Sequence, residues 1–280
     1  MMGAQDGAIW KNELFRFSNR GGCRVYNLLE VDPDVELEPV AKFTLDRTDV
    51  IAPHCNAVCF GSEFYEEGDE YPLLYANVYN NYAKEEDKRI GICCVYRIEK
   101  RDGEFKSTLI QIIEIGFCSD PALWRAYPDS DGPRPYGNFL VDPVGGYYYA
   151  FVMRCEELGT RYFKFNLPSA RDGELDPILG ARRVVLGVED ILDSFDCPYH
   201  RYVQGATFYK NKIYSTEGFS ESEKNPPAIR IIDVLEKKQE KYIALADFEC
   251  TVEAEMIDFY NGVCYYSDAH GSLYTVDFED

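Results

Sequence analysis

The sequence has few basic residues for its size. Its 280 residues include 29 Lys and Arg against 49 Asp and Glu, which gives a formal net charge of −20. A surface this acidic repels phosphate backbones and anionic lipid headgroups, so nucleic acids and membrane surfaces are disfavoured as partners. The same charge keeps a protein soluble.

Long apolar runs are also missing. The longest unbroken one covers residues 147–153, far fewer than the roughly 20 residues that a membrane-spanning helix needs. No N-terminal stretch has the composition of a signal peptide. The ten cysteines form no disulfide framework, because Cys93 and Cys94 are adjacent and Cys55 and Cys59 lie inside a strand-like apolar run. We therefore expect reduced thiols and a cytoplasmic location.

Several catalytic motifs are absent. The sequence contains no Gly-x-Ser-x-Gly elbow, no phosphate-binding Gly-rich loop before a Lys, no dinucleotide fingerprint and no His-Glu-x-x-His motif. Serine acyl transfer, nucleotide hydrolysis and hydride transfer therefore have no support in the sequence. A zinc finger is disfavoured too, because no second Cys/His pair follows Cys55 and Cys59 at finger-like spacing.

What the sequence does contain is a repeated phrase. Residues 7–15 return as residues 205–214 and, more loosely, as residues 255–266. Each copy has a small or polar start, an apolar stretch, a tight turn that contains Asn, and a second apolar stretch. This pattern is typical of a β-hairpin, and its repetition indicates stacked units around a common core.

Five units can be traced along the chain, each with up to four period-2 strands. They predict an all-β, five-bladed β-propeller with mostly four-stranded antiparallel blades, and a six-bladed propeller is the alternative. The fifth unit offers only three strands. We expect a short helix around residues 188–195 and the last strand of the third unit at residues 183–186. The predicted single domain covers residues 1–280, with blades at approximately 3–50, 51–117, 134–196, 199–249 and 250–280 and insertions at 118–135 and 168–196.

In a propeller the first strands of all blades converge on a central channel, and here the starts of these strands are unusually polar. We expect a ligand site at the channel mouth, with Glu255 and His54 as candidate catalytic residues. The candidate ligand-binding residues are Gln5, Asp6, Asn56, Tyr136, Asn138, Tyr202 and Gln204. In the plainer interpretation these groups bond one another and channel water.

A metal ion is a further possibility at this ring. Asp6, Asn56, Asn138 and Glu255 carry the hard oxygen donors that calcium or magnesium accepts. A divalent cation such as calcium is therefore the cofactor to consider, with its ligands unassigned.

One stretch of the chain resembles the glutaminyl cyclase (glutamine cyclotransferase) propellers of plants and bacteria. Tyr-Val-Gln-Gly-Ala at residues 202–206 and Ile-Tyr-Ser-Thr-Glu-Gly at residues 213–218 are similar to the Thr-Gln-Gly-like and Tyr-Glu-Ser-Thr-Gly-like phrases of that family. The resemblance covers roughly the last eighty residues. It implies that Glu255 stands at the position of the family's catalytic acid and Gln204 at that of its Gln. The family's Asn-Glu-Leu-Glu phrase is missing here. The chain also resembles gluconolactonase-type propellers, which gather Glu and Asn around a divalent metal but have six blades.

Three functions follow as expectations. The first is binding of a small molecule or a sugar-like ligand at the polar channel mouth, with Tyr136 and Tyr202 as stacking surfaces. The second is an enzyme, either a cyclotransferase-like acyl transferase or a metal-assisted hydrolase or lactonase, with Glu255 as acid and base. The third is a protein-interaction scaffold that uses an outer face.

Overall fold

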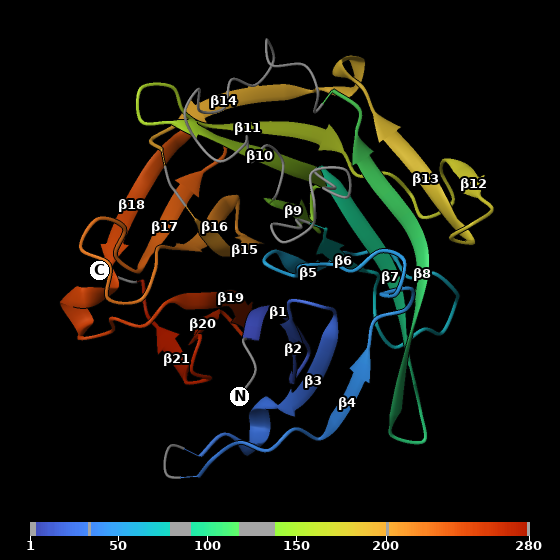
Figure 1. Cartoon of the computed structure of the whole chain (residues 1–280), viewed down its shortest axis with the longest axis horizontal. Coiled ribbons are helices and arrows are strands. Elements are labelled where there is room, and N and C mark those ends of the chain that lie inside the picture. Colours follow the sequence, from blue (N-terminus) through green and yellow to red (C-terminus); the bar gives the residue numbers. More distant parts are fainter. Residues whose placement is uncertain (1–3, 33–34, 79–90, 118–137, 200–201, 279–280) are drawn as a thin grey trace.

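The protein is a ring of five β-sheets (Figure 1). The computed structural model describes residues 4–32, 35–78, 91–117, 138–199 and 202–278. Each sheet is a blade whose first strand lies nearest the centre of the ring, so the predicted all-β, five-bladed propeller is confirmed. Helix in the described part of the chain is confined to three 3-10 turns, which are η1 (Leu28–Glu30), η3 (Val188–Asp190) and η4 (Leu245–Phe248).

The blades follow one another in chain order. Blade 1 holds β1 (Ala4–Trp10), β2 (Glu13–Ser18), β3 (Gly22–Asn27) and β4 (Ala41–Thr44). Blade 2 holds β5 (Val58–Phe60), β6 (Leu74–Asn77), β7 (Ile92–Arg101) and β8 (Glu104–Ile115). Blade 3 holds β9 (Asn138–Asp142), β10 (Tyr147–Cys155), β11 (Gly159–Asn166) and β14 (Asp193–Cys197). Blade 4 holds β15 (Val203–Tyr209), β16 (Lys212–Glu217), β17 (Ala228–Asp233) and β18 (Lys238–Ala244). The described part of blade 5 holds β19 (Ala254–Tyr260), β20 (Val263–Asp268) and β21 (Leu273–Val276).

The repeated phrase forms the hairpin between the first two strands of blades 1, 4 and 5. In blade 4 the two turn residues Lys210 and Asn211 have φ of 47° and 62°, and in blade 5 Asn261 and Gly262 have φ of 50° and 84°. Two successive residues in the left-handed region make the two-residue turn whose twist matches that of paired strands, and Asn and Gly adopt this region most readily. The Asn of the phrase is therefore a turn residue.

The segment between β11 and β14 leaves blade 3 and joins blade 2. β13 (Ala181–Leu186) runs parallel to β8, and β12 (Glu174–Asp176) folds back on β13 (Figure 1). The prediction that residues 183–186 form the last strand of blade 3 is therefore wrong, because β14 takes that place. The predicted helix at residues 188–195 is also wrong, since only the η3 turn precedes β14. The physical reason is that β13 pairs the outer edge of the long β8 strand, which would otherwise expose unpaired backbone groups.

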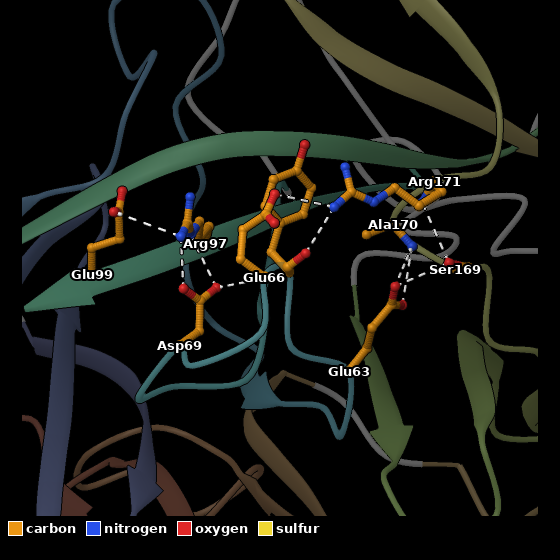
Figure 2. Close-up of polar contacts among 9 residues, drawn as sticks. Glu63, Glu66, Asp69, Arg97, Glu99, Ser169, Ala170 and Arg171 are labelled. Atoms are coloured by element: carbon orange, nitrogen blue, oxygen red, sulfur yellow. Dashed lines mark hydrogen bonds and ion pairs between the residues drawn. The ribbon is translucent and has the colours of Figure 1, made fainter.

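The segment between β11 and β14, called the crossover below, is held against blade 2 at its start by side-chain contacts (Figure 2). Glu63, in the loop between β5 and β6, accepts a hydrogen bond from the Ala170 amide at 3.0 Å. The ring of Tyr65 lies between two guanidinium groups, with Arg171 at 4.0 Å and Arg97 at 5.5 Å from its centroid. Cation–π contacts of this kind stabilise partly desolvated pairs. They tie the crossover to the β5–β6 loop.

Each neighbouring pair of blades encloses one apolar cluster. Alternate residues of a strand point to opposite sides of its blade, so Phe15 and Phe17 of β2 pack toward blade 2 whereas Leu14 packs toward blade 5. Among the described residues, the smallest cluster is the one that closes the ring between blades 5 and 1. Its buried members are Ile9, Leu14, Tyr26, Leu28 and Met256.

Hydrogen bonds supplement this small cluster at the closure. The Asp258 carboxylate of β19 accepts from the Ile9 amide of β1 at 2.7 Å. The Arg16 guanidinium of β2 donates to the Asp268 carbonyl oxygen at 2.5 Å. The ring is thus closed by polar contacts together with a modest apolar interface.

One buried carboxylate joins the inner strands of three blades. Asp6 of β1 is 0% exposed, and its Oδ2 accepts from the Val58 amide of β5 at 2.9 Å and from the Ala206 amide of β15 at 3.3 Å. Its Oδ1 accepts from the Gly7 amide at 2.8 Å. Because blades 1 and 4 are not neighbours in the ring, the bond to Ala206 crosses the centre and sets the spacing of the inner strands.

A glycine makes this close approach possible. A Cβ atom at Gly205 would lie 2.9 Å from Asp6 Oδ1 and 2.7 Å from the Glu255 carbonyl oxygen. Both distances are shorter than non-bonded atoms tolerate, so any side chain here would push the inner strands apart. The glycine of the repeated phrase therefore has a packing role in blade 4.

Replacement of Asp6 by Ala is expected to lower the free energy of unfolding by about 3 kcal/mol. The Val58 and Ala206 amides would stay buried without an acceptor, and each such group costs about 1–3 kcal/mol. Chemical denaturation measures the change, with exposed Asp49→Ala as the control, for which a shift within about 0.5 kcal/mol is expected. Equal shifts in the two variants would contradict the role given to Asp6.

Candidate functional site

The inner strands of three blades carry a β-bulge near their start. In blade 4 the register shifts between Val203 and Gly205, which leaves Gln204 as the extra residue. The same shift leaves Glu255 as the extra residue in blade 5 and, at the matching distance from the hairpin turn, Gln5 in blade 1. Bulges re-aim side chains and are frequent beside functional sites. The three bulge residues, Gln5, Gln204 and Glu255, thus occupy corresponding places at the channel mouth, the end at which the inner strands begin.

Glu255 is the one acid among the three bulge residues, and it is buried with one carboxyl oxygen unpaired in the described structure. It is 5% exposed, and its Oε2 has no hydrogen-bond partner among the residues that the structure describes. Burial raises the pKa of Glu255 well above its ordinary value, Glu253 and Asp6 raise it further, and Arg16 opposes the shift. Burial therefore favours the protonated carboxyl, which can both donate and accept a hydrogen bond.

The amides of the other two bulge residues differ in their partners. The Gln204 amide donates to the Glu253 carboxylate and to the Gly218 carbonyl oxygen, the latter at 3.3 Å. Burial raises the pKa of Glu253 as well. The side-chain amide oxygen of Gln5, Oε1, is buried and has no partner in the described part of the chain. Two acceptor oxygens, on Gln5 and Glu255, therefore remain for a molecule that is not part of the fold.

Two of the predicted ligand-binding residues connect the blades instead. Both Asp6 oxygens accept backbone N–H groups, as described above. The Asn56 amide donates to the Val203 carbonyl oxygen of blade 4 at 3.3 Å, and its own oxygen accepts from the Asn77 amide. These bonds hold the inner strands together. Asp6 and Asn56 therefore have partners within the fold.

His54 precedes β5, and its backbone amide donates to the Asn77 carbonyl oxygen at 3.0 Å. Burial lowers the pKa of its imidazole to about 4, so the ring is neutral at neutral pH. A base with so low a pKa accepts a proton weakly. His54 is therefore a weaker candidate for acid–base chemistry than Glu255.

Three predicted ligand-binding residues remain, which are Tyr202, Asn138 and Tyr136. Tyr202 has φ of 56°, and its ring centroid lies 4.1 Å from that of Phe219. A bulky residue in the left-handed region is strained, and such strain gathers at binding sites. Asn138 begins β9, although its side chain lies outside the described structure. Tyr136 lies outside the described residues altogether.

Sequence reasoning missed Asp258. Its carboxylate accepts from the Ile9 and Phe259 amides and from the Thr207 hydroxyl at 2.7 to 2.8 Å, so it joins blades 5, 1 and 4. Burial raises its pKa to about 6. The sequence did contain a signal for it. When the copies of the repeated phrase are aligned on their turns, Asp258 is an acid inside an otherwise apolar strand and corresponds to Thr207 of blade 4.

In the described ranges, no three His, Cys, Asp or Glu side chains are placed to share a metal ion. The divalent-cation hypothesis stays a prediction. In the same ranges no helix has the length and apolar character that crossing a bilayer requires.

The buried acids predict a specific dependence of stability on pH. An Asp258 carboxyl with a folded-state pKa of about 6 and an unfolded-state pKa near 3.8 binds more protons in the folded state between these values. Stability from this group is therefore fully present below pH ~4 and declines by about 3 kcal/mol as the pH rises to ~6.

Denaturation curves at pH 4, 5, 6 and 7 should show a smaller decline for Asp258→Asn than for the natural chain. The other buried acids stay in both proteins, so the difference reports on Asp258 and on its electrostatic interaction with Asp6. Parallel curves for the two proteins would contradict the burial of this carboxyl.

Comparisons with known proteins assign no family to the chain. No protein-family model matches the chain, and no curated protein matches it. Among solved structures, Myxococcus xanthus glutaminyl cyclase is 11% identical over 99% of this chain and 92% of its own, with a TM-score of 0.49. Apo AztD from Citrobacter koseri is 13% identical over 86% of this chain and 47% of its own, with a TM-score of 0.32. The Dos1 propeller is 7% identical over 98% of this chain and 56% of its own, with a TM-score of 0.38. The chain thus spans about half of the second and third proteins.

Proposed function

We propose that this propeller binds a small, hydroxyl-rich ligand of the sugar type at its channel mouth. The observation that supports this most is the buried carboxyl of Glu255, which has one oxygen without a partner among the described residues and a raised pKa. Gln5 and Gln204 hold the matching bulge positions in two other blades. Each of the three blades therefore has one polar side chain at the bulge of its inner strand.

The chemistry of these groups favours a neutral polar ligand. A protonated carboxyl and two amides offer both donors and acceptors, which is what hydroxyl groups need. Tyr202, whose ring is packed on Phe219, provides an aromatic surface of the kind that sugar-binding sites use.

A second candidate is catalysis with Glu255 as general acid. A raised pKa keeps the proton available near neutral pH, which is the property that a general acid requires. Under this hypothesis Glu255→Gln keeps ligand binding and removes turnover. Ammonia release from an N-terminal glutaminyl dipeptide and hydrolysis of a sugar lactone are the two assays. The binding proposal predicts no turnover in either assay, whereas turnover that Glu255→Gln abolishes would establish the enzyme.

The binding proposal is tested by saturation-transfer NMR with glucose, galactose, N-acetylglucosamine and sorbitol. The natural chain is expected to bind at least one of these compounds. Gln5→Ala should weaken that binding at least tenfold, because the buried Gln5 amide oxygen has no partner in the described structure and one hydrogen bond of about 1.4 kcal/mol to the ligand is lost.

Glu104→Gln, on an exposed strand end of blade 2, is the control and should bind as the natural chain does. The proposal fails if none of the four compounds binds, or if Gln5→Ala and the control bind equally well.

A further inference from the structure

A row of three cations crosses blade 1 on the side that faces blade 5. Arg16 of β2 stands directly opposite Arg24 of β3, and Arg24 stands directly opposite Lys42 of β4. Like charges in directly opposed positions destabilise a sheet. The row is therefore unfavourable for the fold by itself, in a chain that has an excess of acids.

No acid of the described structure forms an ion pair with this row, although Asp268 and Glu255 oppose the lowering of the Arg16 pKa by burial and three acids line a neighbouring cavity. Arg24 and Lys42 form no ion pair with a described residue, and Arg16 donates to a backbone carbonyl oxygen. Elsewhere the sheets match their charges. In blade 3, for example, Arg161 stands opposite Asp196 and the two side chains form an ion pair at 2.8 Å. The cation row is an exception that calls for a partner from outside the fold.

The row lines a cavity of about 410 Å³ between blade 1 and the turn that joins β20 to β21. Ala269, His270 and Gly271 of that turn form the opposite wall. A neighbouring cavity of about 350 Å³ shares Arg16 and Arg24 with the first. The two cavities occupy the ring closure, where the apolar cluster is smallest.

Two deeply buried polar groups line these cavities without a partner of their own. Arg16 is 9% exposed, and its Nε has no hydrogen-bond acceptor among the described residues. Ser267 of β20 is 1% exposed, lines the second cavity, and its hydroxyl also lacks a partner there. Buried donors of this kind are normally paired. Oxygen atoms of a bound anion would provide the acceptors.

We propose that the cleft between blades 1 and 5 binds a small, multivalent oxyanion, which is a phosphorylated or polycarboxylate compound, through Arg16, Arg24 and Lys42. Guanidinium groups match the geometry of phosphate and carboxylate oxygens, and the ammonium group adds charge. The ligand is small because the cavity is small and because Asp32, Glu36 and Glu38 line its neighbour and would repel an extended polyanion. This site shares Arg16 with the surroundings of Glu255, but it does not depend on the sugar proposal, because its test changes only Arg24 and Lys42.

Isothermal titration calorimetry at low ionic strength with inorganic pyrophosphate and with citrate tests this site. The natural chain should bind at least one of the two anions, and raising the salt to about 0.3 M should weaken the binding, because salt screens exposed charges. Binding of pyrophosphate alone indicates a phosphoryl ligand, and binding of citrate alone indicates a polycarboxylate ligand.

The double variant Arg24→Gln/Lys42→Gln should bind at least tenfold more weakly. Lys106→Gln, which removes an exposed cation from blade 2, is the matched control and should bind as the natural chain does. Without ligand, the double variant should melt at the same temperature as the natural chain or higher, since it relieves repulsion within the row.

Three results would overturn the proposal. The first is that the natural chain binds neither anion. The second is that the double variant binds as tightly as the natural chain, or that Lys106→Gln weakens binding as much as the double variant does. The third is a lower melting temperature of the free double variant, which would show that the row stabilises the fold without a ligand.

Discussion

The hydrogen bonds of one buried carboxylate set the spacing of the inner strands. Asp6 accepts backbone N–H groups from its own strand, from blade 2 and from blade 4. Gly205 gives it room, because a side chain there would meet both Asp6 and the backbone of blade 5. The inner strands of blades 1, 2 and 4 are therefore joined directly at this level. The proposed ligand site uses the bulge residues at the starts of three inner strands.

The closure of the ring is the second feature on which the function depends. Blades 5 and 1 share the smallest apolar cluster of the described structure, and polar contacts of Asp258 and Arg16 supplement it. Arg16 is near the channel mouth, since it affects the pKa of Glu255, and it also lines the cationic cleft. The interface that contributes least to the apolar core is thus the one that adjoins both proposed sites. Functional groups and apolar packing are concentrated at different interfaces of the same ring.

Much of the fold could be predicted from the sequence because its signals are local. Hairpin turns with Asn and Gly, and strands with alternating apolar residues, each lie within a few positions of one another. The crossover to β13 could not be predicted in this way. Residues 183–186 have the composition of a strand, but which sheet they join depends on the open edge of β8, far away in the sequence.

The candidate sites were also only partly predictable from the sequence. Gln5, Gln204 and Glu255 stand out because polar residues begin otherwise apolar strands, although their shared bulge position becomes visible only in the register. The cation row of Arg16, Arg24 and Lys42 has no signature in the sequence, because the pairing of three strands brings it together.

The most direct test of the account is the ionisation of Glu255 itself. Carboxyl ¹³C NMR titration, with the signal assigned by its loss in Glu255→Gln, should show a pKa well above that of an exposed Glu. A Glu255 signal that titrates near pH ~4.3, as an ordinary carboxyl does, would contradict the buried channel-mouth site.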